Sequence, residues 1–450
     1  MNQWSLELLT TINRFVWGPE MMVVFLTVGL FLTFRTGLIQ FRRISVIVRE
    51  TLGAIRERAW GAEGEITPFQ ATMVALGGTM GQGNLLGVTT AILIGGPGAV
   101  FWMWVAGVLG MATKFTEAAL AVHYRVRYDD GSVSGGPMYY LARGLPPGLR
   151  WLGAVYAFLA AFAAFGIGNL TQSSAMAESL RAAFGVPVGI SGLFIALVAA
   201  FILAGGIRRI AAFAQSLVPL MLFFFLAAGL FVLATRVELL GQAFAAIFRG
   251  AFALDAAAGG AAGYALAAAL RAGVGRGIFS NEAGLGSAAI AHAQAQVDHP
   301  VRQGFWGVIE VFLDTLVVNT VMALLVLTSG VLEGSAAQVY LAAWDLPGGA
   351  MVAALVLAMF VFTTLVSWGF YGEEAAGFLF GEGVRWPYRI TYIVFAFVGA
   401  LGGFELVTLV AETMNGLMAI PNLFGLVALG AVVARLVRGF FSGEPWEPPK

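Results

Sequence analysis

One glycine-rich stretch, Gly77-Gly78-Thr79-Met80-Gly81-Gln82-Gly83-Asn84, interrupts an otherwise apolar, membrane-length segment at about residues 66–94. Its glycines disfavour a helix, because each costs roughly 1 kcal/mol relative to alanine. A helix break inside a bilayer is tolerated only where the freed backbone groups face protein or a wet cavity. A glycine-interrupted hydrophobic segment therefore favours the binding site of a membrane transporter. The alternative, a small-residue face for close helix packing, does not need the interleaved polar side chains.

The composition is that of a membrane protein. Hydrophobic residues make up 59% of the 450 residues and charged residues only 11%, whereas a soluble domain carries about 25% charged residues. The formal net charge is zero, so no nucleic-acid partner is expected. The chain has no cysteine, which excludes disulfides and thiolate metal sites.

No residue pattern points to an enzyme. The three histidines are scattered, and the sequence holds no serine–histidine–aspartate arrangement, His-Glu-x-x-His motif or phosphate loop. The Gly-x-Gly at residues 81–83 lacks the strand–turn–helix setting of a dinucleotide site. We therefore expect no catalytic residue and no organic cofactor.

The hydropathy pattern predicts an all-α polytopic protein with eleven transmembrane spans. The expected spans cover residues 15–34, 66–94, 98–124, 151–180, 189–203, 209–234, 252–272, 301–330, 350–371, 388–401 and 421–437. A basic amphipathic stretch at 41–58 is expected to lie in the plane of the cytoplasmic interface. Residues 404–418 are interpreted as a surface or re-entrant helix. The predicted units are an N-terminal part (1–60), a ten-helix transporter core (61–438) and a cytoplasmic tail (439–450).

The basic residues predict the orientation. Of the 25 lysines and arginines, 20 lie in segment flanks that share one side if the N-terminus is outside. Positive charge collects on the cytoplasmic side of membrane proteins. We therefore expect a multi-pass protein of the cytoplasmic (inner) membrane, with the N-terminus outside and the C-terminus in the cytoplasm.

A weak internal repeat accompanies this layout. The glycine-rich stretch Gly259-Gly260-Ala261-Ala262-Gly263 lies in the seventh expected span, five spans after the first break. This spacing is typical of an inverted five-plus-five repeat in which a broken helix opens each half. Simple small-residue packing is the alternative, because no polar side chain accompanies the second stretch.

Several longer motifs resemble the alanine or glycine:cation symporter family. They are residues 78–84 (GTMGQGN), 95–104 (GGPGAVFWMW), 110–115 (GMATKF), 135–140 (GGPMYY), 276–284 (RGIFSNEAG) and 415–422 (NGLMAIPN). The resemblance implies a leucine-transporter-like fold of ten core helices, here with one additional N-terminal transmembrane helix. It also implies sodium-coupled import of alanine and glycine by alternating access.

The first break offers groups for an amino acid and for cations. Free N–H groups and a half-helix N-terminus favour a carboxylate, and freed carbonyls suit a small hard cation. The resemblance implies that Asn84 and the Thr79 carbonyl hold one sodium beside the substrate carboxylate. The Gly77 and Met80 carbonyls would then face a second sodium.

The second sodium needs ligands from another helix. The resemblance assigns them to Thr363, Thr364 and the Phe360 carbonyl in the ninth span. The alternative is that these threonines only bond back to carbonyls of their own helix.

The pocket for the amino acid is predicted from polar and bulky residues near the break. Gln172 is expected to accept a hydrogen bond from the substrate ammonium, or alternatively to hydrogen-bond between helices. Trp368 is expected to close the pocket against the substrate side chain, or alternatively to be an ordinary packing residue. Ser174 stands where related sequences tend to carry asparagine. The predicted substrate-binding residues are Thr79, Gly81, Gln82, Gly83, Gln172, Thr364 and Trp368.

Charged residues inside the expected spans allow two interpretations. Lys114 and Glu117 are three residues apart and can pair on one helical face, and Asp314 is a further intramembrane charge. Structural pairing is favoured over a proton relay. The run Ser280-Asn281-Glu282 is interpreted as a gate or a tie between loops at the cytoplasmic face.

The sequence therefore predicts a symporter for small neutral amino acids, with sodium as the coupling ion. Its expected partners are the amino acid, sodium and membrane lipid, and the expected state is a monomer. A proton-coupled amino acid transporter is the alternative. A channel is disfavoured because the chain is long and asymmetric, and ATP-driven transport because no segment is long enough for a nucleotide domain.

Overall fold

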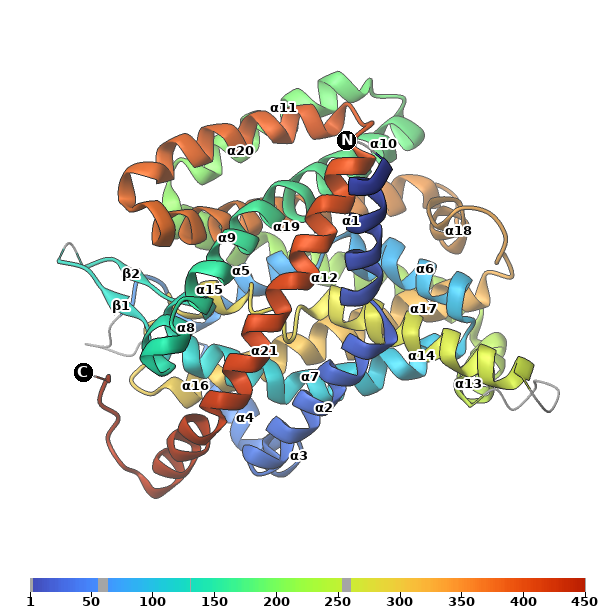
Figure 1. The fold of residues 1–450 in the computed structure, drawn as a ribbon. Coiled ribbons are helices and arrows are strands. Elements are labelled where there is room, and N and C mark those ends of the chain that lie inside the picture. Colours follow the sequence, from blue (N-terminus) through green and yellow to red (C-terminus); the bar gives the residue numbers. More distant parts are fainter. Residues whose placement is uncertain (1–2, 56–63, 130, 253–259, 450) are drawn as a thin grey trace.

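The computed structural model describes residues 3–55, 64–129, 131–252 and 260–449, and it is mostly helical (Figure 1). The helices up to residue 203 are α1 Gln3–Val16, α2 Pro19–Arg35, α3 Ile39–Arg42, α4 Ile44–Glu50, α5 Pro68–Thr79, α6 Val88–Gly95, α7 Gly98–His123, α8 Pro137–Gly144, α9 Leu152–Phe165, α10 Thr171–Phe184 and α11 Val188–Leu203. Two short antiparallel strands, β1 Val126–Arg127 and β2 Val133–Ser134, form a hairpin after α7.

The later helices are α12 Gly206–Thr235, α13 Val237–Ala251, α14 Gly260–Asn281, α15 Ala289–His292, α16 Pro300–Val311, α17 Asn319–Thr328, α18 Ala336–Ala343, α19 Gly349–Phe380, α20 Arg385–Ala400 and α21 Glu405–Ser442. Three π-helical segments interrupt the ladder: η2 Gly83–Gly87, η4 Gly166–Leu170 and η5 Phe312–Val318. Three short 3₁₀ turns complete the described elements: η1 Leu52–Ala54, η3 Pro147–Leu149 and η6 Glu382–Val384. π-helical turns are rare and gather at functional sites. One of the three, η2, directly follows the helix break that the sequence predicts.

Several helices have the length and apolarity needed to cross a bilayer. Among the described residues these are seven: Leu6–Arg35, Gly98–His123, Pro147–Phe184, Gly206–Thr235, Pro300–Thr328, Gly349–Phe380 and Glu405–Ser442. The apolar helices Gly83–Gly95 and Val188–Leu203 are shorter. The chain is therefore a multi-pass helical membrane protein, while the count of eleven spans remains a prediction.

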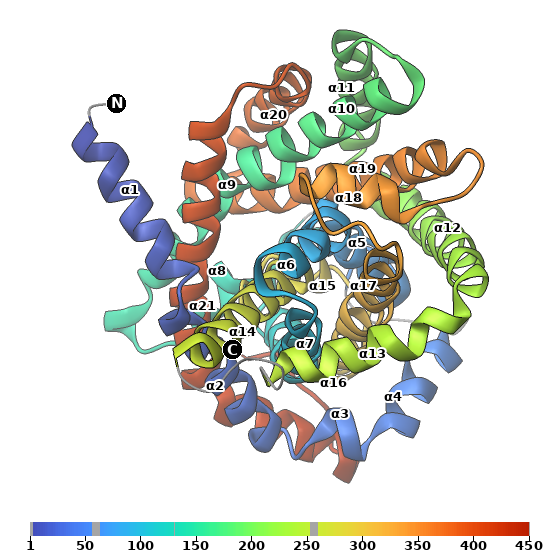
Figure 2. The same cartoon turned by 90° about the vertical axis from the view of Figure 1, so that its right-hand side faces the viewer.

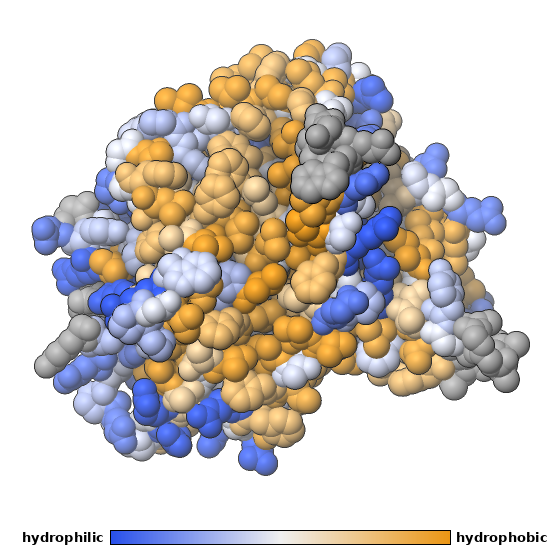
Figure 3. All heavy atoms as spheres, viewed as in Figure 1, coloured by the Kyte–Doolittle hydropathy of each residue, from blue (hydrophilic) through white to orange (hydrophobic). Residues whose placement is uncertain are grey.

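The outer surface carries large apolar side chains of the kind that face lipid. Figure 3 shows a broad apolar surface across the middle of the molecule, with hydrophilic residues gathered at the lower left, near the C-terminal end of α21. Phe201 on α11 and Phe223 on α12 are 69% and 72% exposed. In water these side chains would form a large exposed apolar patch. In a bilayer they contact lipid, so their apolar surface is removed from water.

The broken helix formed by α5, η2 and α6 lies at the centre of the bundle. Figure 2 shows α5 and α6 enclosed by neighbours that include α7, α14, α17 and α19. The N-terminal helices lie outside: Trp17, between α1 and α2, donates from Nε1 to the carbonyl of Glu412 on α21 over 3.1 Å. The predicted additional helix thus packs on the outside of the bundle.

Two expected elements differ from the prediction. The stretch at 41–58 is not one amphipathic helix: α3 and α4 are separated at Arg43, whose guanidinium stacks 4.2 Å from the Phe441 ring. Residues 56–58 lie outside the described residues. Residues 404–418 are neither a surface nor a re-entrant helix, because residues 405–442 form the single helix α21, which continues through Pro421.

Candidate functional site

The first break has the location that the sequence predicts. The start of α5 is fixed by a capping box, in which Thr67 accepts from the Gln70 backbone and Gln70 accepts from the Thr67 backbone. The helix ends at Thr79, and Met80 takes φ −79° and ψ 88°, which is outside the helical region. The chain resumes its helical path at Gln82 and continues as η2, so Met80 and Gly81 lie between the two helical parts, while the Met80 N–H still donates to the Leu76 carbonyl over 2.8 Å.

Five oxygen atoms converge where this break meets α19. The Thr364 hydroxyl lies 3.0 Å from the Gly77 carbonyl, 3.1 Å from the Met80 carbonyl and 3.1 Å from the Phe360 carbonyl. The Thr363 hydroxyl lies 2.8 Å from the Phe360 carbonyl. A hydroxyl has one proton, so Thr364 cannot donate to three carbonyls at once. We call these five residues the Thr364 cluster.

The predicted alternative for the two threonines is also present. Thr363 bonds back to the carbonyl of Met359 over 3.2 Å, and Thr364 to that of Phe360. Thr364 differs because it also bridges to α5. Back-bonding within α19 therefore does not account for the Thr364 cluster.

The glycines of the break allow α5 and α19 to approach closely. A Cβ atom on Gly78 would lie 2.5 Å from Tyr371 Oη, and one on Gly81 would lie 2.6 Å from Thr364 Oγ1. Ser367 donates to the carbonyl of Val74 over 2.8 Å at the same contact. The glycines of residues 77–84 therefore do both things that the sequence allows: they interrupt the helix, and they let α5 and α19 pack closely.

Gly78→Ala is expected to lower the stability of the protein, because the new methyl group must displace the Tyr371 ring. Overpacking of this kind costs about 1–3 kcal/mol. Thermal unfolding of detergent-purified protein, followed by circular dichroism, measures the effect. Gly189→Ala on α11 is the matched control, since no atom lies within 4 Å of its added Cβ. Equal unfolding temperatures for the two variants would contradict the close approach of α5 and α19.

A second polar group surrounds Asn84, which is fully buried. Its Oδ1 accepts from the Gly81 backbone N–H over 3.0 Å. Its Nδ2 lies 2.8 Å from Ser280 Oγ, 2.6 Å from Asp314 Oδ1 and 3.0 Å from Asn319 Oδ1. The group joins three interrupted helices: α5–α6, α14–α15 and α16–α17. We call Asn84, Ser280, Asp314 and Asn319 the Asn84 cluster.

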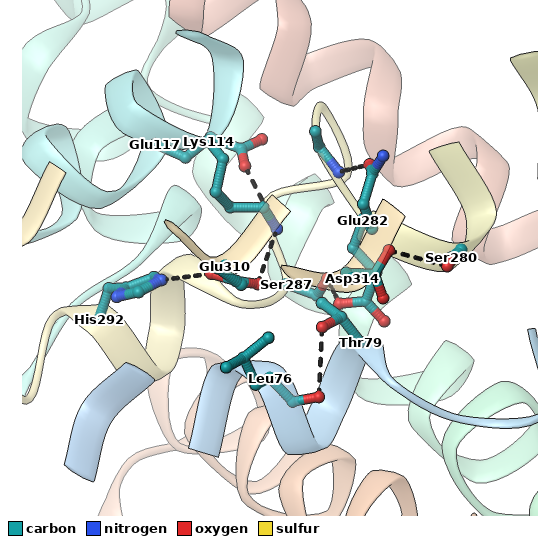
Figure 4. Close-up of polar contacts among 12 residues, drawn as sticks. Leu76, Thr79, Lys114, Glu117, Ser280, Glu282, Ser287, His292, Glu310 and Asp314 are labelled. Atoms are coloured by element: carbon teal, nitrogen blue, oxygen red, sulfur yellow. Dashed lines mark hydrogen bonds and ion pairs between the residues drawn. The ribbon is translucent and has the colours of Figure 1, made fainter. Parts of the chain in front are cut away.

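Sequence reasoning missed three members of this cluster. Asp314 was expected to be structurally paired, but it accepts from Asn84, Ser280 and Thr315 and pairs with no basic side chain among the described residues. Figure 4 shows Ser280 and Asp314 facing each other near Thr79. The sequence pattern around Asn319 does not single this residue out. Their spacing along the chain gave no local signal, since Asn84 and Asn319 are 235 residues apart.

The second break is not where the sequence placed it. Gly259 lies outside the described residues, and Gly260, Ala261, Ala262 and Gly263 form the first turn of α14, which runs unbroken to Asn281. The break follows, with positive φ at Glu282 (55°), Gly284 (96°) and Gly286 (82°), before α15 begins. A left-handed conformation at a non-glycine residue such as Glu282 is strained and is typical of functional sites.

The run from Ser280 to Glu282 is therefore not a tie at the cytoplasmic face. All three side chains are buried at the second break, and Ser280 reaches the first one through Asn84. The available signal was the glycine and polar pattern of residues 276–284, which resembles the first break. Sequence reasoning used this motif only for the family resemblance.

Gln172 and Trp368 lie at the opposite side of the break. Gln172 Oε1 is 3.5 Å from the Gln82 backbone nitrogen, and its Nε2 donates to the carbonyl of Ile167 over 3.0 Å. Trp368 is one turn beyond Thr364 on α19 and is buried, and its Nε1 donates to Glu282 Oε1 over 3.0 Å. The predicted substrate-binding residues are thus brought to one region between the two breaks.

Two other predicted residues also lie at the breaks. The Thr79 hydroxyl donates to the Leu76 carbonyl within α5 over 3.3 Å (Figure 4). Gly83 contacts Phe279 of α14, where an added Cβ would lie 3.4 Å from the ring. No side-chain cluster of the histidine, aspartate and glutamate type that holds transition metals occurs among the described residues.

A cleft opens beside Phe279. It has a volume of about 500 Å³ and lies between α1, α6, α14 and α21. Its lining residues include Trp17, Arg271, Arg276, Phe279 and Glu412. Arg276 lies beyond the expected span 252–272, but it belongs to α14 together with Arg271 because this helix extends to Asn281.

The far side of the two breaks is closed by backbone pairing. The Glu65 N–H donates to the Gln294 carbonyl over 2.9 Å, and the Gln296 N–H donates to the Ile66 carbonyl over 2.8 Å. These bonds join the segment before α5 to the segment after α15. The site is therefore approached from one side and sealed on the other.

Comparison with known proteins covers nearly the whole chain. A model of the sodium:alanine symporter family matches residues 2–445. The sodium/alanine symporter AgcS of Methanococcus maripaludis is 42% identical over 445 residues, which cover 96% of this chain and 97% of that protein. The probable sodium/glutamine symporter GlnT of Bacillus subtilis is 35% identical, covering 95% of this chain and 89% of the relative.

Solved structures share the fold at low sequence identity. MhsT in complex with L-phenylalanine superposes with a TM-score of 0.59 and 14% identity, covering 85% of this chain and 100% of MhsT. A manganese transporter of Eremococcus coleocola gives a TM-score of 0.53 at 13% identity, covering 87% and 93% of the two chains. The likeness to these transporters confirms the expected leucine-transporter-like fold, while the arrangement of the helix repeat remains a prediction.

Proposed function

Because the chain belongs to the sodium:alanine symporter family, we propose that it imports alanine and glycine across the cytoplasmic membrane together with sodium ions. Members of this family are transporters rather than enzymes. In the proposed orientation the N-terminus is outside and the C-terminus is in the cytoplasm. The inverted five-plus-five arrangement would begin its halves with the broken helices α5–α6 and α14–α15.

The Thr364 cluster is the observation that carries this proposal. Three carbonyls and two hydroxyls converge on one point from two helices, and they supply more acceptors than protons. Carbonyl and hydroxyl oxygens are the ligands that alkali cations take in transporters of this kind. None of these groups titrates near neutral pH, so the cluster supports sodium rather than a proton as the ion bound here.

The Asn84 cluster is proposed as the other cation site, the one beside the substrate carboxylate. The Thr79 carbonyl and Asn84 were the expected ligands, and Asp314 supplies a carboxylate without a basic partner among the described residues. At present the Asn84 amide oxygen faces Gly81 and its nitrogen faces the three oxygens. A half-turn of the amide would direct the oxygen toward the cation and free the Gly81 N–H.

The freed backbone groups of the break would then hold the substrate. The N–H groups of Gly81, Gln82 and Gly83 suit a carboxylate, and Gln172 lies close enough to orient it or to accept from the ammonium. The carboxylate would lie beside the cation in the Asn84 cluster. Amino acid and ion would therefore stabilise each other, which is the physical basis of coupling.

Alternating access would follow from the two sides of the site. Phe279 separates the breaks from the open cleft, while the pairing of Ile66 and Gln296 seals the other side. Inward release would require that this pairing open while Phe279 and α14 close over the site. Arg276 and Glu412 line the cleft and would approach each other during that closure.

Trp368 is proposed to limit the pocket to small side chains. Trp368→Ala is expected to let leucine and valine compete for alanine uptake at least about tenfold better, a change of about 1.4 kcal/mol. Competition assays in proteoliposomes measure this, with Trp344→Ala as the control for loss of a buried tryptophan elsewhere. Unchanged selectivity in Trp368→Ala would reduce Trp368 to a packing residue.

The direct test of the proposed function is uptake of labelled alanine into proteoliposomes with and without an inward sodium gradient. We expect accumulation only with the gradient, and competition by glycine. The same assay with glutamine separates alanine-type from glutamine-type members, since one relative carries the name of a glutamine symporter. Equal accumulation with a proton gradient in sodium-free buffer would favour the proton-coupled alternative.

A further inference from the structure

A third buried polar group lies apart from the two clusters described above. It consists of Lys114 and Glu117 on α7, His292 on α15, and Gln303 and Glu310 on α16, and all five side chains are fully buried. Figure 4 shows Lys114 between Glu117 and Glu310, with His292 on the far side of Glu310. We call this group the Lys114 network.

The network carries more negative than positive charge when His292 is neutral. One ammonium faces two carboxylates: Lys114 Nζ lies 3.5 Å from Glu310 and 3.9 Å from Glu117. Glu282 and Asp314 act on the same ammonium from the second break and from η5. A net charge buried away from water is costly unless it is compensated. One additional proton would bring the five residues to neutrality.

The other ionisable groups around the network do not supply that charge. The hydroxyls of Tyr140, Tyr156 and Tyr371 donate elsewhere, to Asn422 Oδ1 and to the carbonyls of Leu285 and Val74 respectively. Arg125 lies beyond α15, where its Nη1 donates to the carbonyls of Ala293 and Ala295. Among the described residues around the network, His292 is the ionisable group that has a network side chain within hydrogen-bond distance of each ring nitrogen.

The hydrogen bonds of His292 accommodate both protonation states. Its Nε2 is 2.7 Å from Glu310 Oε2, and its Nδ1 is 2.7 Å from Gln303 Nε2, an amide donor. This arrangement requires neutral imidazole with the proton on Nε2. The Gln303 Oε1 atom is buried and has no hydrogen-bond partner among the residues that the structure describes. If the amide turns by 180°, this oxygen accepts from Nδ1–H, and imidazolium then has an acceptor on each side.

Lys114 does not fully neutralise the two carboxylates, so a protonated His292 can act as a second cation in the network. Its Nζ makes no hydrogen bond among the described residues, and neither do Glu117 Oε2 and Glu310 Oε1. Glu310 is therefore not saturated by Lys114. A protonated His292 would share Glu310 with Lys114, which balances two positive charges against two carboxylates.

The network is connected to the element that has to move during transport. Glu117 accepts from the Gly284 N–H in the second break over 2.9 Å and from Asn422 Nδ2 over 2.7 Å. His292 itself ends the short helix α15, next to the pairing that seals the site. Any shift of α15 against α16 changes the His292–Glu310 contact.

We propose that the Lys114 network is a proton-binding site, with the proton held at His292, and that its occupancy changes when the amino acid binds and α15 shifts against α16. The inference rests on the proposed function, since it needs alanine or a similar amino acid to bind between the breaks. It adds to the two cation sites a third ion that is bound and released with the conformational change. Binding affinity for the amino acid should therefore depend on pH even at saturating sodium.

The test is calorimetry of alanine binding to the full-length, detergent-purified protein at saturating sodium and about pH 6.5. Titrations in two buffers of different ionisation enthalpy report the number of protons exchanged. We expect the observed enthalpy to differ between the buffers for the parent protein. Equal enthalpies in both buffers, with alanine binding intact, would overturn the proton site and leave the proposed function standing. Absence of any alanine binding at high sodium would overturn the proposed function itself.

Variants of single residues identify which side chain exchanges the proton when alanine binds. His292→Gln is expected to abolish the difference between buffers, whereas His123→Gln, a change to a histidine that contacts Trp446 instead of the network, should keep it. His299 needs no variant, because burial lowers its pKa to about 4 and it stays neutral in this range.

A second variant guards against a misfolded His292→Gln. Gln303→Glu keeps the length of the side chain and places a carboxylate at Nδ1, which should hold the proton on His292 through the whole cycle. It is therefore expected to bind alanine without proton exchange. Proton exchange that persists in either folded variant would contradict the assignment to His292.

Discussion

Thr364→Val is expected to raise the sodium concentration for half-maximal alanine binding by about tenfold or more. Valine keeps the shape of threonine but removes the side-chain oxygen that bridges from α19 to the carbonyls of Gly77 and Met80. Leaving buried polar groups without their partner costs about 1–3 kcal/mol, and each 1.4 kcal/mol is a factor of ten. Alanine binding measured at several sodium concentrations gives the shift.

Linkage between sodium and alanine determines at which sodium concentrations the effect on alanine binding is largest. Alanine affinity should fall mainly at low sodium and recover at high sodium, because coupling between two ligands is reciprocal. Thr116→Val is the matched control, since Thr116 is fully buried and its hydroxyl donates to the Ala112 carbonyl of its own helix. If Thr364→Val keeps the sodium dependence of the parent, the Thr364 cluster is a packing contact.

Asn84→Ala is expected to have the largest effect on transport, with alanine uptake lowered by about 100-fold or more at moderate sodium. The change removes an amide that contacts Gly81 and three oxygens from two other interrupted helices. Two or more buried hydrogen bonds are lost, at about 1–3 kcal/mol for each group left unpaired. Unlike Thr364→Val, this variant should weaken alanine binding even at high sodium, because the amide borders the proposed carboxylate position.

Asn169→Ala separates this effect from general loss of a buried amide. Asn169 is equally buried, and its Nδ2 donates to the Tyr392 carbonyl on α20 instead of to either break. Both variants should be compared at matched amounts of folded protein, judged by size-exclusion chromatography. If Asn169→Ala lowers uptake as much as Asn84→Ala, the assignment of Asn84 to the ion site fails.

The first break could be predicted because its signal is local. Glycines and polar side chains stand together in one apolar segment, and the energetic cost of glycine in a helix predicts the break within a few residues. The Thr364 cluster required the family resemblance as well, since Thr363 and Thr364 alone also fit back-bonding to their own helix. The structure brings all five of the predicted residues together.

The second break could not be predicted from the same signal. Residues 259–263 have more small residues than residues 282–286, but alanine and isolated glycine are compatible with a helix when neighbours pack closely. The actual break depends on positive φ at Gly284 and Gly286 and on contacts of Glu282 with Trp368, which lies far away in sequence. Because the expected span ended at residue 272, Arg276 was placed outside the helix to which it belongs.

The Asn84 cluster shows why the remaining site residues escaped sequence reasoning. Asp314 and Asn319 lie in a segment predicted as one ordinary span, and Ser280 lies between two predicted spans. Only the three-dimensional arrangement places all three around one amide. The π-helical turns η2 and η5, which direct Asn84 and Asp314 inward, have no sequence signature comparable to a glycine break. Charge alone suggested pairing of Asp314, because nothing local indicated its actual partners.

The central claim is that amino acid and sodium cross the membrane together. The most direct measurement is simultaneous uptake of radioactive sodium and labelled alanine into proteoliposomes that contain the purified protein, without ATP. We predict that alanine added outside accelerates sodium entry, that the two fluxes keep a fixed ratio, and that Thr364→Val lowers both at low sodium. Alanine entry that proceeds unchanged when choline replaces sodium, with no alanine-dependent sodium flux, would contradict the account.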